Sequence, residues 1–155
     1  MWNNVAVVSA DDYYIGPMGR YSYDKDLEPE AHRSCFRRFL GLMERVVEVI
    51  VVDNTASRLL EASPYVLAAE AHGYVVKVVT VTCAVEKMLE RNAASERGQI
   101  PNGLIEVMAE RIAKDDAPPW WTTEVYDEER LDAACKLFSI DPKTDDELVC
   151  RELTG

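Results

Sequence analysis

The sequence has no apolar run approaching the roughly 20 residues that a membrane-spanning helix needs. It also lacks a basic start followed by an apolar stretch, so we expect no signal peptide. Only two histidines occur, and the four cysteines are scattered without C-x-x-C spacing. These absences argue against a disulfide framework and predict no metal site. We therefore expect free thiols, a reducing cytoplasmic location and no membrane partner.

The composition itself is that of a globular protein with a core of its own, at 155 residues, 48% hydrophobic and 29% charged. The net charge of −11 is unevenly placed, because residues 115–155 hold 12 acidic and 4 basic side chains. We predict an α/β domain over residues 1–114 and an acidic C-terminal extension over residues 115–155. This extension is expected to be a loop or extended arm with a candidate helix at residues 128–139. Trp120 and Trp121 are expected to dock on the domain, and the alternative is that they stack on a base. A protein with this negative charge does not bind nucleic acid through its overall charge. Any contact with nucleic acid would need a local basic cleft.

Hydrophobic periodicity predicts alternating strands and helices. Strands are expected at 5–8, 46–52 and 75–81, and helices at 29–45, 63–73, 85–91 and 104–112. Within this scheme, Ser63 and Pro64 form a typical helix start. The alternation predicts a three-layer α/β/α fold with a mainly parallel sheet. Ligands of such sheets bind beyond the carboxyl ends of the strands.

Two groups of polar residues follow expected strands directly. Residues 9–13 hold paired carboxylates, Asp11 and Asp12, and one of them could accept a proton from a hydroxyl nucleophile. The alternative is that these acids only cap a turn. Residues 49–55, VIVVDNT, end in an acid and a hydroxyl, as do strands that hold a magnesium shell in nucleotide-binding sheets. Ordinary turn chemistry explains the same residues.

A third group lies between two expected helices. Arg91 and Arg97 flank a polar, glycine-containing segment within ERNAASERGQIP, residues 90–101. A mobile lid that brings arginines to phosphate groups has this pattern. A solvated loop with surface charges has it as well.

Taken in order, these segments resemble one family. SADDYY, YSYD, EAHRSCFRR, VIVVDNT, SPYVLAAEAHGYVVKVV and ERNAASERGQIPNGLIEVM resemble the P-loop kinases related to the kinase domain of bacteriophage polynucleotide kinase. The resemblance runs from about Val5 to Ile112. It implies an ATP- and magnesium-dependent kinase that transfers a phosphoryl group to a hydroxyl of a nucleotide, a nucleic acid or a small molecule.

The resemblance also implies roles for individual residues. Asp11 matches the general base that faces the acceptor hydroxyl. Asp53 and Thr55 match the strand-end segment near the transferred phosphate. Arg91 and Arg97 match the lid arginines that clamp the phosphates of the nucleotide.

On the acceptor side, the resemblance places Asp12, Tyr13 and Arg20 at the substrate. The phage enzyme carries an arginine after its Asp-Asp-Tyr, which meets a phosphate of the substrate, and here Tyr14 stands in that place. Arg20 is the candidate to replace it if the acceptor is a nucleic-acid end.

One family motif is missing. No G-x-x-x-x-G-K-S/T sequence occurs in the chain, so the resemblance implies a domain without its first strand and phosphate-binding loop. In the family the missing strand lies beside the one that matches residues 50–52. The chain could be a piece of a longer kinase, a degenerate relative that keeps a cleft, or one part of an assembly in which a protein partner or a second copy fills the gap. We expect an inactive or impaired kinase, and the alternative is a non-catalytic binding or scaffold protein.

Overall fold

The computed structural model describes residues 4–95 and 100–137. Contacts divide the chain into two compact units, with the boundary between Thr55 and Ala56. The described residues up to Thr55 belong to unit 1, and those from Ala56 onward belong to unit 2. Each unit contains parallel strands and helices, so the predicted α/β class is confirmed at that level. The three-layer arrangement around one sheet stays a prediction.

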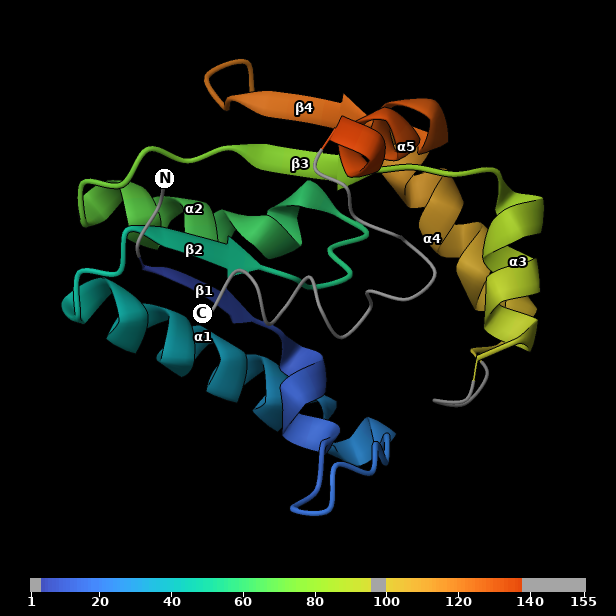
Figure 1. Cartoon of the computed structure of the whole chain (residues 1–155), viewed down its shortest axis with the longest axis horizontal. Helices are drawn as coiled ribbons and strands as arrows, with labels where there is room; N and C mark the ends of the chain where they lie inside the picture. Colours follow the sequence, from blue (N-terminus) through green and yellow to red (C-terminus); the bar gives the residue numbers. More distant parts are fainter. Residues whose placement is uncertain (1–3, 96–99, 138–155) are drawn as a thin grey trace. The chain divides into compact units, whose positions relative to one another are not determined.

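Unit 1 is a strand–helix–strand unit (Figure 1). The strands β1 (Val5–Val8) and β2 (Val49–Val52) pair in parallel, with Val8 opposite Val52. Between them, two short 3-10 helices, η1 (Ala10–Tyr14) and η2 (Lys25–Leu27), precede the helix α1 (Glu28–Glu44). A stripe of α1 with a period of four residues is buried and supplies four of the eight buried apolar residues described in unit 1: Ala31, Cys35, Phe39 and Met43. The predicted helix at 29–45 is therefore confirmed.

The end of α1 explains why β2 begins three residues later than predicted. The N–H of Val46 bonds to the carbonyl of Met43, and that of Val47 bonds to the carbonyl of Leu42. These two bonds form a Schellman motif, which needs a left-handed residue after the helix. Val46 takes that place with φ of 57°, which strand geometry excludes.

Unit 2 contains four helices and two strands within the described residues. They are α2 (Leu59–Ala71), β3 (Val78–Val81), α3 (Val85–Ala93), α4 (Asn102–Lys114), β4 (Thr123–Tyr126) and α5 (Glu128–Leu137). The strands β3 and β4 pair in parallel, and α3 and α4 pack side by side (Figure 1). The expected extended arm thus supplies a strand to unit 2. Within the described ranges, none of the helices combines the length and apolar character that crossing a bilayer takes.

The helix α2 begins earlier than its sequence indicates. Ser63 and Pro64 were expected to start it, but Pro64 lies inside the helix. The start is set instead by Glu61, whose carboxylate accepts the N–H of Arg58 at 3.2 Å, and by Asp115, whose carboxylate accepts the N–H of Leu59. These acceptors satisfy N–H groups that a helix start otherwise leaves unpaired, and Asp115 comes from a distant part of the sequence.

The predicted end of α2 is confirmed, and comparison with α1 gives a testable prediction. Gly73 has φ of 81° and its N–H bonds to Glu70, which completes a Schellman motif like that of Val46. Val46 is 77% exposed, so its side chain contributes little packing to offset its left-handed backbone. Val46→Gly should raise the free energy of unfolding by about 0.5–1 kcal/mol, and Gly73→Ala should lower it by about 1 kcal/mol. Urea unfolding measures both. A loss of stability in Val46→Gly would contradict the backbone assignment.

Candidate functional site

The carboxyl ends of β1 and β2 lie at one edge of unit 1. The N–H of Asp53 donates to the carbonyl of Val8 at 2.9 Å, and the N–H of Ala10 donates to Asn54 Oδ1 at 2.8 Å. The two acid-bearing segments, which are far apart in the sequence, are therefore joined directly after their strands. Sequence reasoning placed them at a common edge, and the register of the strands confirms that placement.

The two adjacent acids after β1 differ in their surroundings. Asp12 accepts the N–H of Ser9 and forms an ion pair with Arg38 at 2.8 Å, so it caps η1 and ties it to α1. Asp11 instead extends from the exposed side of η1, where one carboxylate oxygen accepts the hydroxyl of Tyr21 at 3.2 Å. Asp12 thus has a structural role, and its contact with a substrate stays a prediction. Asp11 keeps an oxygen available for a ligand.

Tyrosine rings gather beside Asp11. The ring of Tyr14 makes edge contacts with Tyr13, Tyr21 and Tyr23, at centroid distances of 6.0, 5.8 and 5.1 Å. Tyr14 is 6% exposed, and its hydroxyl has no hydrogen-bond partner within the described residues. Burial, followed by the nearby phenol of Tyr23 and surrounding carboxylates, raises the pKa of Tyr14 above its usual value. The phenol of Tyr14 therefore stays neutral, and the exposed rings of Tyr13 and Tyr23 offer apolar faces to solvent.

Arg20 lies in the loop after η1, which turns at Gly19 with φ of 72°. The N–H of Gly16 bonds to the carbonyl of Arg20 at 3.0 Å and closes this loop. The side chain of Arg20 is exposed, and within the described part of the chain it has no ion pair. Its predicted contact with a substrate stays a prediction.

Asn54 is a positioning residue that sequence reasoning missed. Besides accepting the N–H of Ala10, its amide contacts Cys35 Sγ of α1, with Nδ2 at 3.5 Å. One half-buried side chain therefore links the ends of both strands to the central helix. The Asp-Asn-Thr sequence after an apolar strand is the only signal, and it is also common in turns.

Asp53 and Thr55 lie exposed after β2, and their place near a transferred phosphate stays a prediction. Within the described ranges, no group of three or more His, Cys, Asp or Glu residues could hold a metal ion. The backbone N–H groups of Ser9, Ala10, Asp11 and Asp53 are all bonded within unit 1. A phosphate cradle needs a row of available N–H groups. These four N–H groups are therefore not available to a phosphate group.

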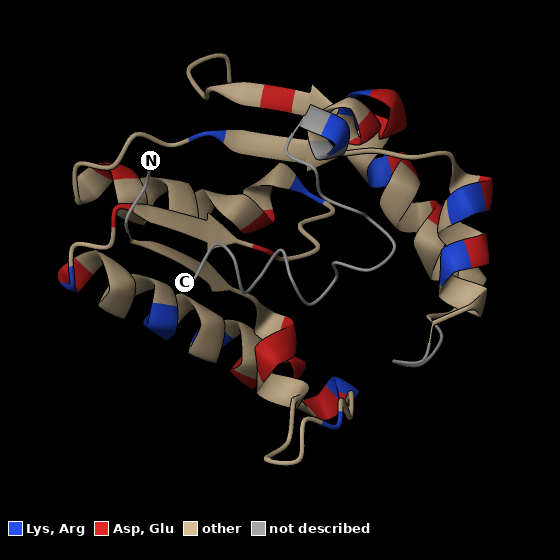
Figure 2. Ribbon diagram, in the orientation of Figure 1, with Lys and Arg blue, Asp and Glu red and all other residues tan. Residues whose placement is uncertain are grey.

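Arg91, the first predicted lid arginine, belongs to unit 2. Arg91 Nη2 lies 3.5 Å from Glu128 Oε1, and Lys87 of the same helix pairs with the other oxygen of that carboxylate. Figure 2 shows basic segments along α3 and acidic segments on α5. The hydrogen bond to Glu128 and its charge raise the pKa of Lys87. Arg97, the second predicted lid arginine, lies outside the described residues.

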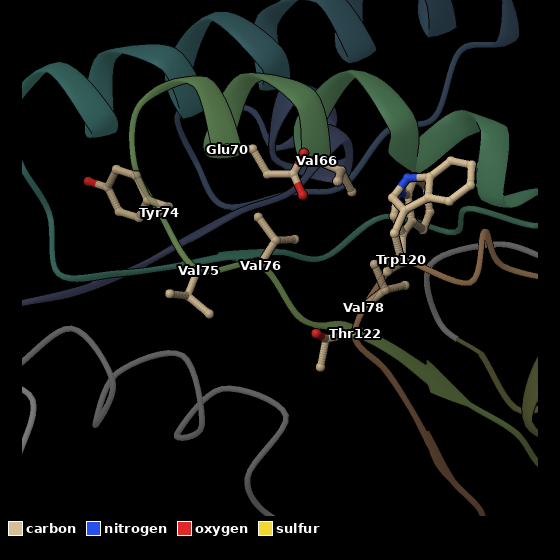
Figure 3. Close-up of a pocket in the computed structure, with 9 residues that line it drawn as sticks. Val66, Glu70, Tyr74, Val75, Val76, Val78, Trp120 and Thr122 are labelled. Atoms are coloured by element: carbon tan, nitrogen blue, oxygen red, sulfur yellow. The ribbon is translucent and has the colours of Figure 1, made fainter.

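Unit 2 also has a hollow of about 230 Å³ beside α2 (Figure 3). Its lining comes from Val66 and Glu70 of α2, the segment before β3 and the Trp120–Thr122 segment. The sequence predicted that both tryptophans dock on the domain. Trp120 is instead 76% exposed, whereas Trp121 is half-buried. This hollow contains no predicted catalytic residue.

Comparison with a solved structure bears on the fold. A sugar kinase from Janibacter sp., solved without ligand, matches with a TM-score of 0.51 over 90% of this chain and 82% of its own, at 18% sequence identity. The fold of this chain is kinase-like. The resemblance to kinases deduced from the sequence is supported to that extent, while the relation to polynucleotide kinases stays a prediction.

Sequence comparison adds one relative. Human NEDD4-binding protein 2 is 35% identical over 71 residues, or 45% of this chain. The matched part spans about 4% of that human protein, so the match does not define a family for the chain. No protein-family model matches the chain.

Proposed function

We propose that this chain carries the acceptor side of an ATP-dependent phosphotransferase, related to the P-loop kinases of the polynucleotide kinase type. ATP and magnesium are the proposed cosubstrate and cofactor of the complete enzyme. The 155-residue chain alone is inactive or impaired, because it contains no phosphate-binding loop. Two of its oxygen-bearing side chains, Asp53 and Thr55, are assigned to the side that faces the transferred phosphate.

The joined ends of β1 and β2 are the observation that carries this proposal. They present Asp11 and Asp53 after strands in register, at the edge where ligands of parallel sheets bind. Asp12 is already paired with Arg38, which leaves Asp11 as the acid able to act on a bound hydroxyl.

In the proposed reaction, the second carboxylate oxygen of Asp11 accepts the proton of the acceptor hydroxyl. The hydroxyl oxygen forms a bond to the γ-phosphorus of ATP as the bond from that phosphorus to ADP breaks, and ADP leaves. The hydroxyl of Tyr21 donates to the other oxygen of Asp11 and fixes the carboxylate plane. Asn54 holds the backbone at Ala10, and thereby the start of η1. Binding of the nucleotide phosphates is left to a segment that this edge does not provide.

The place for that segment is the second edge of β2. Within the described residues β2 pairs with β1 alone, and Val51 of β2 is 40% exposed. A further strand at this edge would bring its own loop beside Asp53, because parallel strands end at a common edge. A preceding segment, a protein partner or a second copy could supply it.

The acceptor is proposed to be a hydroxyl on a ring, such as that of a sugar, a nucleoside or a nucleic-acid end. Near Asp11, the exposed rings of Tyr13 and Tyr23 suit stacking on a ring of the acceptor. The fold similarity to a sugar kinase makes a sugar one of the acceptors to assay.

The test is phosphoryl transfer from radiolabelled ATP. We would assay the natural chain and a version joined at its N-terminus to a strand, a G-x-x-x-x-G-K-S/T loop and a helix. Sugars, nucleosides and oligonucleotides with free 5′ hydroxyls serve as acceptors. We expect background transfer by the natural chain and transfer to one acceptor class by the extended chain. If the extended chain binds ATP yet transfers to none, the alternative of a non-catalytic binding or scaffold protein is favoured.

A further inference from the structure

Glu128 bridges two cations of α3 in unit 2. Lys87 and Arg91 are four residues apart, so their side chains lie on the same face of the helix. Each binds a different oxygen of the Glu128 carboxylate, Oε2 for Lys87 and Oε1 for Arg91. This is the arrangement in which two cations hold an oxyanion of a ligand.

Glu128 comes from the acidic part of the chain. It is the first residue of α5, which follows directly on β4. A second carboxylate of the same region, Glu124, pairs with Lys77 at 2.9 Å and with Arg130 at 3.1 Å. The acidic segment is therefore held on unit 2 by ion pairs at two places.

From this geometry we infer that Lys87 and Arg91 form an anion subsite for a phosphate group, and that the carboxylate of Glu128 occupies it as an internal competitor. The ligand class is a polyphosphate, which offers anionic oxygens as the Glu128 carboxylate does, but carries more negative charge. The inference rests on the proposed function, in which the complete enzyme binds nucleotide phosphates, and the kinase resemblance assigns Arg91 to them. We add Lys87 as the second cation of the phosphate subsite. We also infer that Glu128 lowers the affinity for phosphate while no ligand is bound.

The exposure of the three side chains sets the size of the effect. Lys87 and Arg91 are more than half exposed and Glu128 is 30% exposed, so each contact is weakened by water. A competitor held by two such contacts should lower the affinity for an anion by about three- to tenfold. An incoming polyphosphate can therefore displace it.

The experiment uses the full 155-residue chain and inorganic tripolyphosphate, followed by isothermal titration calorimetry at low ionic strength. Glu128→Gln should tighten binding by about three- to tenfold. Glu129→Gln is the matched control, because Glu129 is exposed, adjacent on α5 and without an ion pair among the described residues. It removes the same charge and should change the dissociation constant by less than about twofold.

A second set of variants locates the site. Adding Lys87→Ala and Arg91→Ala to Glu128→Gln should abolish the gain. Adding Arg111→Ala instead should preserve it, because Arg111 lines a different hollow, with Arg58 and Asp115. Equal effects of Glu128→Gln and Glu129→Gln, a gain that survives loss of both α3 cations, or no measurable binding by any variant would each overturn the inference. The readout of this experiment is equilibrium binding. The anion-subsite inference can therefore fail while the extended chain still transfers phosphoryl groups, and the inference can hold when no transfer is found.

Discussion

Asp11→Asn is expected to lower the turnover number of the extended, phosphate-loop-bearing chain by about 10²–10⁴-fold. The substitution keeps the size of the side chain and the hydrogen bond from Tyr21, but the amide cannot take a proton at neutral pH. ATP affinity should remain nearly unchanged, because Asp11 acts on the acceptor and not on the donor. Steady-state kinetics with the acceptor found in the transfer assay, together with ATP titration, separates the two quantities.

Asp12→Asn is the matched control for this prediction. It removes the same charge one residue away, where the carboxylate pairs with Arg38 and caps η1. Because that pair is partly exposed, we expect less than about a tenfold fall in turnover and a small loss of stability. Similar losses of turnover in both variants, or a parallel loss of ATP affinity in Asp11→Asn, would remove the general-base role from Asp11.

Phe39→Ala is expected to lower the free energy of unfolding by about 3–5 kcal/mol. Phe39 is 4% exposed and lies in the buried stripe by which α1 covers the β1–β2 pair. Its loss leaves a cavity in a unit whose core comes mainly from α1, η1 and the end of β1. Total stabilities of proteins are only about 5–15 kcal/mol. The edge that carries Asp11 should loosen with it.

Urea unfolding followed by circular dichroism measures this change. Phe36→Ala serves as the comparison, because Phe36 touches Phe39 at a centroid distance of 6.2 Å but is only half-buried. Phe36→Ala should lower the free energy of unfolding by about half as much as Phe39→Ala or less, because less buried apolar area is lost. Equal costs at the two positions would contradict the assignment of Phe39 to the core of unit 1.

Local patterns predicted much of the fold. The four-residue spacing from Cys35 to Met43 identified α1, and the apolar run before Asp53 identified β2. Both signals work because burial on one face sets the periodicity. The common edge of Asp11 and Asp53 followed from the rule that parallel strands end together.

Features set by long-range contacts could not be read in the same way. The start of α2 depends on Asp115, which accepts the N–H of Leu59. The local sequence around Ser63 and Pro64 does not predict this long-range hydrogen bond. β4 was expected only as an extended arm, because four residues flanked by turn formers carry little periodicity. The separate roles of Asp11 and Asp12 depend on Arg38, 26 residues further along the chain.

The most direct test of the account is the affinity for magnesium–ATP, measured by calorimetry on the natural 155-residue chain and on the extended chain. A phosphate-binding loop adds several charge-assisted hydrogen bonds of about 1.5–3 kcal/mol each. The account predicts that the extended chain binds at least about a hundredfold tighter than the natural chain. Equal affinity of the two folded chains would contradict it, because the edge formed by β1 and β2 would then not be the acceptor half of a nucleotide site.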